Sequence, residues 1–217
     1  MTLPETLEFK NYYVEKLYMF ANVETGVLTN RSGRRMLALT NDFLIGLHRA
    51  LESECGARAG EILYRCGKKW GKDFGKGLTA EWSAFYACSF EEFPLAFVQT
   101  LLEQEFACNG WGILELDYQF HAQGVLQLQL EGAIMSDISA TNVDYPVDIL
   151  TAGIISGIFT QLLTRELDCV QSQVGKAAAG VSKFLLSDAA RIAQLLGEAS
   201  KLTTHEQMLD YLLTTRS

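Results

Sequence analysis

The sequence Ala59-Gly60-Glu61-Ile62-Leu63-Tyr64-Arg65-Cys66-Gly67-Lys68-Lys69-Trp70-Gly71, which continues to Gly75, has the most informative spacing of glycines in the chain. Gly67, Gly71 and Gly75 recur at a spacing of four, so on a helix they share one face. Each glycine lowers the stability of a helix by about 1 kcal/mol. A helix that accepts three of them on one face is expected to have another backbone or a flat ligand pressed against it. We predict this helix from Ala57 to about Gly75.

A second set of small residues lies in the most apolar part of the chain, Ile149 to Leu163. A helix is predicted there from Val147 to Thr164, with Ala152, Gly153, Ser156 and Gly157 on its small face. The apolar run is about five residues short of a bilayer span, so a buried helix is favoured. Two helix faces made of small residues in one domain indicate tight core packing. The alternative is a slot for a flat apolar ligand, or a dimer interface, lined by aromatic residues: Tyr64, Trp70, Phe74, Trp82, Phe85 and Tyr86.

Composition limits the class of protein. The chain has 217 residues, which favours one domain with appendages, and 48% of them are hydrophobic, enough for a substantial core. The net charge of −8 and the pI near 4.9 argue against a large nucleic-acid-binding surface. The first residues carry no secretory signal. Five cysteines without a Cys-x-x-Cys pair indicate reduced thiols in a cytosolic protein.

The remaining patterns predict an α+β fold. A hairpin is expected where apolar and polar residues alternate, over 112–120 and 126–131, with an acidic, amide-rich outer face that meets water. Two further short strands should flank residues 175–180. This gives an antiparallel sheet of about four strands, packed by helices on one face. The other predicted helices are Leu7–Val23, with Tyr13, Leu17 and Phe20 on one side; Thr40 or Asn41 to Cys55; Phe90–Cys108, after the capping box at Ser89–Glu92; Asp188–Ser200; and His205–Thr214.

We divide the chain into an N-terminal helical extension (1–35), a ligand-binding domain (36–187) and a C-terminal helical extension (188–217). A turn is expected at residues 30–33, and Asn109-Gly110 should end a helix.

The sequence contains no strong motif for phosphate binding, metal binding or nucleophilic catalysis. The glycine spacing and the residue after Lys72 do not fit a phosphate-binding P-loop, so the lysines at 68, 69, 72 and 76 are expected to form a solvated helix face. The histidines at 48, 121 and 205 lack metal-type spacing, and His48 with Glu52 is expected to be a surface pair. No nucleophile elbow is present, although a triad assembled in space stays open. Glu115, Asp117 and Glu131 are expected on an exposed strand face.

The order of these motifs resembles the 4-vinyl-reductase domain family. The resemblance covers about Thr25 to Leu186. It implies the fold group of a TRAPP vesicle-tethering subunit and of haem-type NO-signalling domains, and a homodimer that binds a small molecule. The residues that carry it are Gly56 to Tyr64, Gly67, Trp70-Gly71, Gly110-Trp111-Gly112, Tyr145-Pro146, Ala152 to Gly157, and Ser182-Lys183-Phe184.

One departure from the family pattern is informative. Many members end with Glu-x-x-Cys-x-x-x-Gly-x-x-x-Cys-x-Phe; aligned on Phe184, this chain has Gln171, Val174, Ala178 and Ser182 at those positions. Cys169 is five residues too early to substitute. Since thiolates are the ligands that soft metals prefer, no metal or redox role of that cysteine pair is carried over, and no metal site is expected.

The resemblance implies a non-catalytic domain that binds a hydrophobic small molecule, with a tetrapyrrole as the leading candidate. Its setting would be chlorophyll biosynthesis or photosystem assembly in a photosynthetic bacterium, in the cytoplasm or peripheral to the photosynthetic membrane. The alternatives are an enzyme subunit in vinyl reduction of a chlorophyll precursor, and a protein-interaction scaffold. No catalytic residue is assigned. The ligand-binding candidates are Arg58, Tyr64, Trp70, Gly71 and Trp82.

Overall fold

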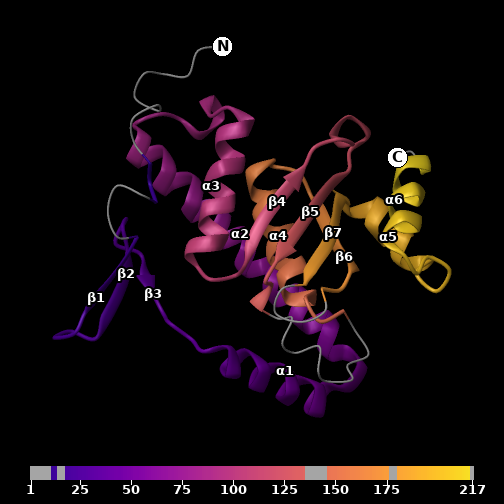
Figure 1. Ribbon diagram of the computed structural model, residues 1–217, viewed down its shortest axis with the longest axis horizontal. Coiled ribbons are helices and arrows are strands. Elements are labelled where there is room, and N and C mark those ends of the chain that lie inside the picture. The colour runs from indigo at the N-terminus through magenta and orange to yellow at the C-terminus, as the bar shows by residue number, and fades with distance from the viewer. Residues whose placement is uncertain (1–10, 14–17, 135–145, 176–179, 216–217) are drawn as a thin grey trace.

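The computed structural model describes residues 11–13, 18–134, 146–175 and 180–215. Its centre is a four-stranded antiparallel sheet in the order β4-β5-β7-β6 (Figure 1). The strands are β4 (Ile113–Asp117), β5 (Leu126–Glu131), β6 (Leu167–Gln173) and β7 (Val181–Asp188). The predicted α+β class and the four-stranded sheet are therefore confirmed. β4 ends before Tyr118, because residues 118–124 form a turn with the short helix η4 (His121–Gln123).

The two helix faces that are made of small residues pack on each other. They belong to α2 (Ala59–Tyr86) and α4 (Ile149–Leu162). A Cβ atom built on Gly71 would overlap the carbonyl oxygen of Ile154, and one on Gly157 would lie 2.7 Å from the Lys72 amide nitrogen. Each helix thus sets its glycines against carbonyl groups of the other, an arrangement typical of closely packed helix pairs with small-xxx-small spacing. Another backbone occupies the space that a flat ligand would need.

α2 is longer than predicted, since it continues past Gly75 to Tyr86. The residues that extend it are Leu78, Trp82 and Tyr86, which are buried at a spacing of four. Their burial on one face offsets the helix-weakening effect of Gly75 and Gly77, and the helix ends where Ala87 adopts a left-handed conformation with φ 51°.

The prediction of a helix over Leu7–Val23 is wrong for residues 19–22, near its C-terminal end. Met19–Asn22 forms strand β1, which pairs antiparallel with β2 (Val27–Asn30), and β2 pairs with β3 (Arg35–Met36). The turn that closes the hairpin decides this, because the Asn22 side chain accepts hydrogen bonds from the amides of Glu24 and Thr25. Residues 1–10 and 14–17 lie outside the described residues. The 1–35, 36–187 and 188–217 division stays a prediction, but the first segment contains strands.

The other predicted helices are found, two of them with shifted ends. α1 (Asn41–Cys55) and α6 (His205–Thr214) match their predictions, and α5 (Ala189–Gly197) is slightly shorter. α3 (Leu95–Cys108) begins five residues late, after the short helix η3 (Phe90–Glu92), because Phe93 precedes Pro94 and is extended. Ser89 therefore does not cap α3. η2 (Gly56–Arg58) joins α1 to α2.

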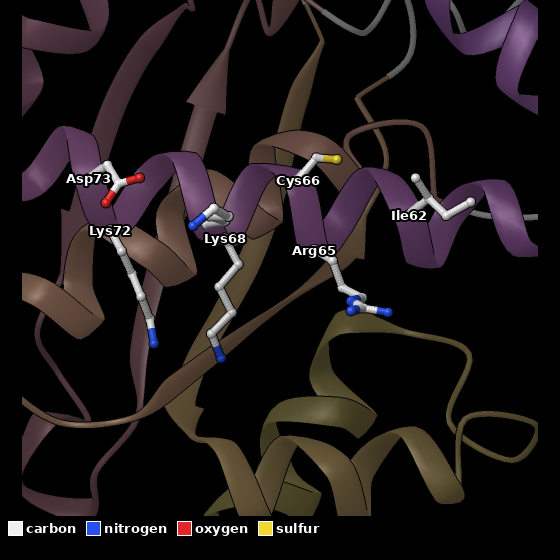
Figure 2. A pocket seen from close by; sticks show the side chains of 7 residues that line it. Ile62, Arg65, Cys66, Lys68, Lys72 and Asp73 are labelled. Carbon is white, nitrogen blue, oxygen red and sulfur yellow. The ribbon is translucent and has the colours of Figure 1, made fainter.

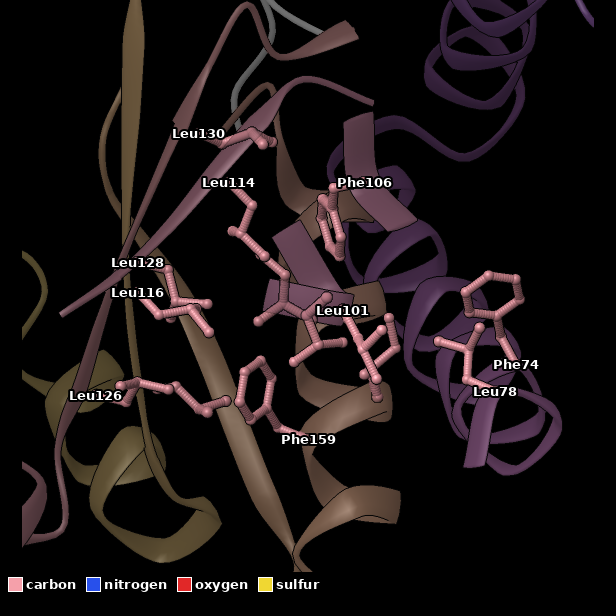
Figure 3. Close-up of a cluster of buried hydrophobic side chains, with 14 of the residues drawn as sticks. Phe74, Leu78, Leu101, Phe106, Leu114, Leu116, Leu126, Leu128, Leu130 and Phe159 are labelled. Atoms are coloured by element: carbon pink, nitrogen blue, oxygen red, sulfur yellow. The ribbon is translucent and has the colours of Figure 1, made fainter. Parts of the chain in front are cut away.

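Helices cover both faces of the sheet, whereas one face was predicted. The inner face contributes leucines of β4 and β5 to the main core, which α2, α3 and α4 complete; Figure 3 shows Leu101, Phe106 and Phe159 directed at these leucines. On the opposite face, α5 and α6 cover β6 and β7 with a second cluster: Val125, Val170, Leu185, Ile192, Leu195 and Leu212. Among the described residues, no helix is long and apolar enough to cross a membrane.

Candidate functional site

A buried carboxylate lies at the centre of the candidate site. Glu105 occupies the apolar stripe of α3, next to Leu101, Leu102 and Phe106, and is 0% exposed. Tyr13 donates its hydroxyl hydrogen bond to Oε2 of Glu105, and Tyr18 donates to Oε1 over 2.8 Å. Asn109 Nδ2 also donates to Oε1, over 2.9 Å. Three donors therefore satisfy one buried carboxylate, as burial of a charge requires.

Trp82 of α2 completes the site. Its indole is 0% exposed, and its Nε1–H donates a 3.1 Å hydrogen bond to the hydroxyl oxygen of Tyr13. The Tyr13 hydroxyl is thus both an acceptor, from Trp82, and a donor, to Glu105. We call Glu105, Trp82, Asn109, Tyr13 and Tyr18 the Glu105 site.

A second carboxylate anchors the segment that supplies these tyrosines. We call residues 11–13 together with Tyr18 the N-terminal arm. Tyr12 donates its hydroxyl to Glu81 Oε2 over 2.8 Å, and the Tyr12 amide donates to the Tyr86 hydroxyl over 3.0 Å. Glu81 also pairs with Arg34 at 2.5 Å. The arm is therefore fixed to α2 through a carboxylate separate from Glu105.

Burial sets the protonation chemistry of the Glu105 site. Desolvation raises the pKa of Glu105, while the hydrogen bonds from Tyr13, Tyr18 and Asn109 lower it. Desolvation and the nearby Glu105 also raise the pKa of both Tyr13 and Tyr18 above the ordinary tyrosine value. The tyrosines therefore remain protonated donors at neutral pH. The arrangement holds two tyrosine hydroxyls against one buried carboxylate, with aromatic rings around them.

The five candidate ligand residues do not come together. Tyr64 and Trp82 are 18 residues apart on the same helix, a rise of about 27 Å along the helix. Tyr64 donates to Asp168 Oδ1 over 2.8 Å and accepts from the Cys169 amide, so it ties α2 to β6. Of the five, Trp82 alone belongs to the Glu105 site.

The other three have different surroundings. Trp70 is 42% exposed and stacks on Phe74 with ring centroids 4.5 Å apart. Gly71 faces the backbone of Ile154. Arg58 is exposed at the end of η2. The two small-residue helices touch each other, as the prediction of tight core packing requires, so the alternative of a flat-ligand slot between their small faces is not supported.

A surface hollow of about 590 Å³ lies along α2, lined by Ile62, Arg65, Cys66, Lys68, Lys69, Lys72 and Asp73. Figure 2 shows Lys68 and Lys72 extending from the side of α2 opposite to Cys66. Lys68 pairs with Asp168, and Lys72 with Glu166, each at 2.5 Å. Lys68 and Lys72 are therefore paired with carboxylates in β6 and directly before it, whereas Lys69 and Lys76 are exposed, as predicted for this face. Since two of its three lysines are already paired with carboxylates, the hollow offers little for an anion.

A different buried cluster contains Gln171 and Ser182, which stand where the family pattern has a glutamate and a cysteine. Gln171 Nε2 and Ser182 Oγ donate to Oδ2 of Asp148 over 2.6 and 2.5 Å, and Asp148 is 0% exposed. Its Oδ1 has no hydrogen-bond partner among the described residues. Val174 is exposed, and residue 178 lies outside the described residues. The cluster joins the start of α4 to the sheet through hydrogen bonds.

We expect Asp148→Asn to be more stable than the wild type at pH 7, with the advantage vanishing near pH 4. Burial raises the pKa of Asp148, so the folded state holds the proton more tightly than the unfolded state. The wild type therefore has its full stability below the ordinary aspartate pKa and loses it as pH rises through the raised value. Asparagine keeps an acceptor for Gln171 and Ser182 without titrating. Urea denaturation of both proteins from pH 4 to 8 checks this, and a pH-independent difference would contradict it.

The histidines have varied surroundings. His48 is buried, whereas a surface position was predicted for it. His121 is exposed and its Nδ1 lies 2.7 Å from the Tyr118 carbonyl oxygen. His205 begins α6, with Nδ1 2.7 Å from Ser172 Oγ and Nε2 3.0 Å from Gln127 Oε1. Within the described ranges, no group of three or more histidine, cysteine, aspartate or glutamate side chains could hold a metal ion.

By sequence, the chain matches no protein-family model and no curated protein. Among solved structures, it is similar to the phenol-responsive sensory domain of the transcription activator PoxR, solved with phenol. The TM-score is 0.63 and the identity 13%, over 92% of this chain and 93% of that one. This likeness is one of fold.

Two further structures are more distant. A trafficking protein particle complex subunit 3 from Naegleria fowleri, covalently bound to palmitic acid, has a TM-score of 0.47 and 13% identity over 68% of this chain and 93% of that one. A vinyl-4-reductase family protein from Methanocaldococcus jannaschii has a TM-score of 0.40 and 12% identity, over 71% and 98%. The structural neighbours thus include members of the fold group that the sequence motifs suggested.

Sequence reasoning missed Glu105, Tyr13 and Tyr18. A signal for Glu105 was present, because it lies three and four residues after Leu102 and Leu101 and next to Phe106, on an otherwise apolar face. Tyr13 and Tyr18 had no such signal, since their partners are 92 and 87 residues away in the chain.

Proposed function

We propose that the chain is a non-catalytic domain that binds a small hydrophobic molecule carrying a hydrogen-bonding group. One observation carries this proposal: a fully buried carboxylate on an apolar helix face, enclosed by aromatic rings and satisfied by two tyrosine hydroxyls and the side-chain amide of Asn109. Binding sites are typically apolar with a few such polar groups. The fold likeness to a phenol-responsive sensory domain supports the same class, because that domain was solved with a small molecule, phenol.

A tetrapyrrole is less favoured as the ligand. A flat macrocycle needs a slot between apolar walls, and the two glycine faces that suggested such a slot are in contact with each other. Chlorophyll biosynthesis, photosystem partners and a role as a vinyl-reduction subunit stay predictions from the family resemblance alone. The homodimer also stays a prediction; four exposed apolar side chains before and along α1 offer a surface for it: Leu37, Leu39, Phe43 and Leu47.

A ligand panel tests the proposal on the full chain. We expect at least one small aromatic alcohol or other small amphipathic molecule to raise the melting temperature in a dose-dependent manner, because a ligand that binds only the folded state stabilises it. The panel should include phenols, fatty acids and a chlorophyll precursor. The matched control is Glu105→Gln, which keeps the size of the side chain and should weaken the response. A response of no compound, or an equal response in Glu105→Gln, would contradict the proposal.

A further inference from the structure

The Glu105 site already holds two groups of one chemical kind. The side chains of Tyr13 and Tyr18 are para-alkylphenols, and each donates its hydroxyl to a different oxygen of Glu105. The Tyr13 hydroxyl also accepts from Trp82 Nε1–H. A phenol hydroxyl has one proton to donate and lone pairs to accept, so both of its functions are matched here. An aliphatic or purely aromatic group would leave Glu105 or Trp82 unsatisfied.

The walls of the site suit an aromatic ring. The rings of Tyr13 and Tyr18 are 5.2 Å apart and tilted by 46°, and Tyr12 meets Tyr13 edge-on at 4.9 Å. Phe90 lies over Trp82 at 6.3 Å. Such edge and offset contacts are those that aromatic rings prefer. A ring that replaced the Tyr13 or Tyr18 side chain would keep these contacts.

The two phenols come from a segment outside the core helices and the four-stranded sheet. Tyr13 and Tyr18 belong to the N-terminal arm, whereas Glu105 and Asn109 belong to α3 and its end, and Trp82 to α2. The arm has its own attachment, because Tyr12 is bound to Glu81 and to Tyr86, and the Tyr12 carbonyl accepts a 2.8 Å bond from Arg31. The tyrosines at the Glu105 site can therefore leave while Tyr12 keeps the arm attached.

We propose that Glu105 and Trp82 form a recognition site for the hydroxyl of a small phenol, and that Tyr13 and Tyr18 of the same chain occupy this site until such a phenol displaces them. The inference rests on the proposed function and adds the ligand class and a competing arm. Binding of the ligand releases part of the arm, which gives the domain a structural change to pass on. A ligand with the same ring and hydroxyl as tyrosine can replace a tyrosine side chain without leaving a buried group unpaired.

The test compares p-cresol with toluene, which has a similar shape and no hydroxyl. Dissociation constants are measured by calorimetry for the wild type and for Tyr13→Ala/Tyr18→Ala, in the full chain. We expect the double variant to bind p-cresol at least tenfold more tightly than the wild type does, and at least tenfold more tightly than it binds toluene. Adding Glu105→Leu should remove the preference for p-cresol. Phe93→Ala is the control, because Phe93 is a buried ring of the same cluster without a carboxylate partner, and its cavity should not prefer p-cresol.

If the double variant does not fold, Tyr13→Phe serves instead. It keeps the ring and removes the hydroxyl that Glu105 and Trp82 bind, so p-cresol should bind several-fold more tightly than to the wild type. Equal affinity of the wild type and the opened variants, or no preference of the double variant over toluene, would overturn the inference. A wild type that responds to a non-phenolic ligand of the panel, while p-cresol fails in every variant, would overturn the phenol site and leave the proposed function standing.

Discussion

Gly71→Ala is expected to lower the free energy of unfolding by about 3 kcal/mol, the upper part of the range for overpacking, and Gly71→Leu to prevent folding. The new Cβ atom would overlap the carbonyl oxygen of Ile154 and lie 3.1 Å from its carbonyl carbon. These atoms belong to the backbone of α4, so they cannot rotate away as a side chain could. Alanine alone favours a helix by up to about 1 kcal/mol over glycine, and the clash exceeds that gain.

Gly46→Ala is the matched control for this prediction. Gly46 lies inside α1, and a Cβ atom built there meets nothing within 4 Å. The same substitution should therefore raise the free energy of unfolding by roughly 0.5–1 kcal/mol. Chemical denaturation of the three proteins measures both effects. Equal stability of Gly71→Ala and the wild type would mean that α2 and α4 are not in backbone contact.

Glu105→Ala is expected to cost roughly 3–5 kcal/mol, as removal of one partner from a buried charged network does. The alanine would leave the hydroxyls of Tyr13 and Tyr18 and the amide of Asn109 without their acceptor inside the core. It would also open a cavity where the side chain had been. Glu105→Gln should cost less, because its one carbonyl oxygen can still accept hydrogen bonds.

The control for Glu105 is Glu103 on the same helix. Glu103 is partly exposed and accepts a 2.8 Å hydrogen bond from Gln99. Glu103→Ala should change stability by no more than about 0.5 kcal/mol, as for a surface position. Urea denaturation at pH 7 measures both variants. Similar losses at the two positions would show that Glu105 is not the centre of a buried network.

The glycine faces could be predicted from the sequence because their spacing is local. Gly67 and Gly71 recur every four residues, as do Gly153 and Gly157, so each face is visible without knowledge of the fold. What lay against each face could not be read in this way. The two faces are more than 80 positions apart, and the choice between a helix, a ligand and a partner chain depends on the tertiary arrangement.

The N-terminal segment shows where a local pattern misleads. Tyr13, Leu17 and Phe20 fit one side of a helix, yet residues 19–22 pair with β2 in a hairpin closed by Asn22 and Gly26. Cross-strand pairing overrides helical periodicity here. The candidate site was missed for a related reason: Trp82 was expected to stack on a ligand, while its indole nitrogen binds Tyr13, a residue assigned to a different predicted element.

Fluorine NMR of 5-fluorotryptophan-labelled protein, recorded during a titration with p-cresol, tests whether Glu105 and Trp82 form the ligand site. The chain has three tryptophans, of which Trp82 lies in the Glu105 site, while Trp70 and Trp111 contact each other in a separate aromatic group. Each resonance is assigned with a tryptophan-to-phenylalanine variant. We predict that the Trp82 resonance shifts and saturates while the other two change little. An unchanged Trp82 resonance, with p-cresol shifting Trp70 and Trp111 instead or nothing at all, would contradict the assignment of the ligand site to Glu105 and Trp82.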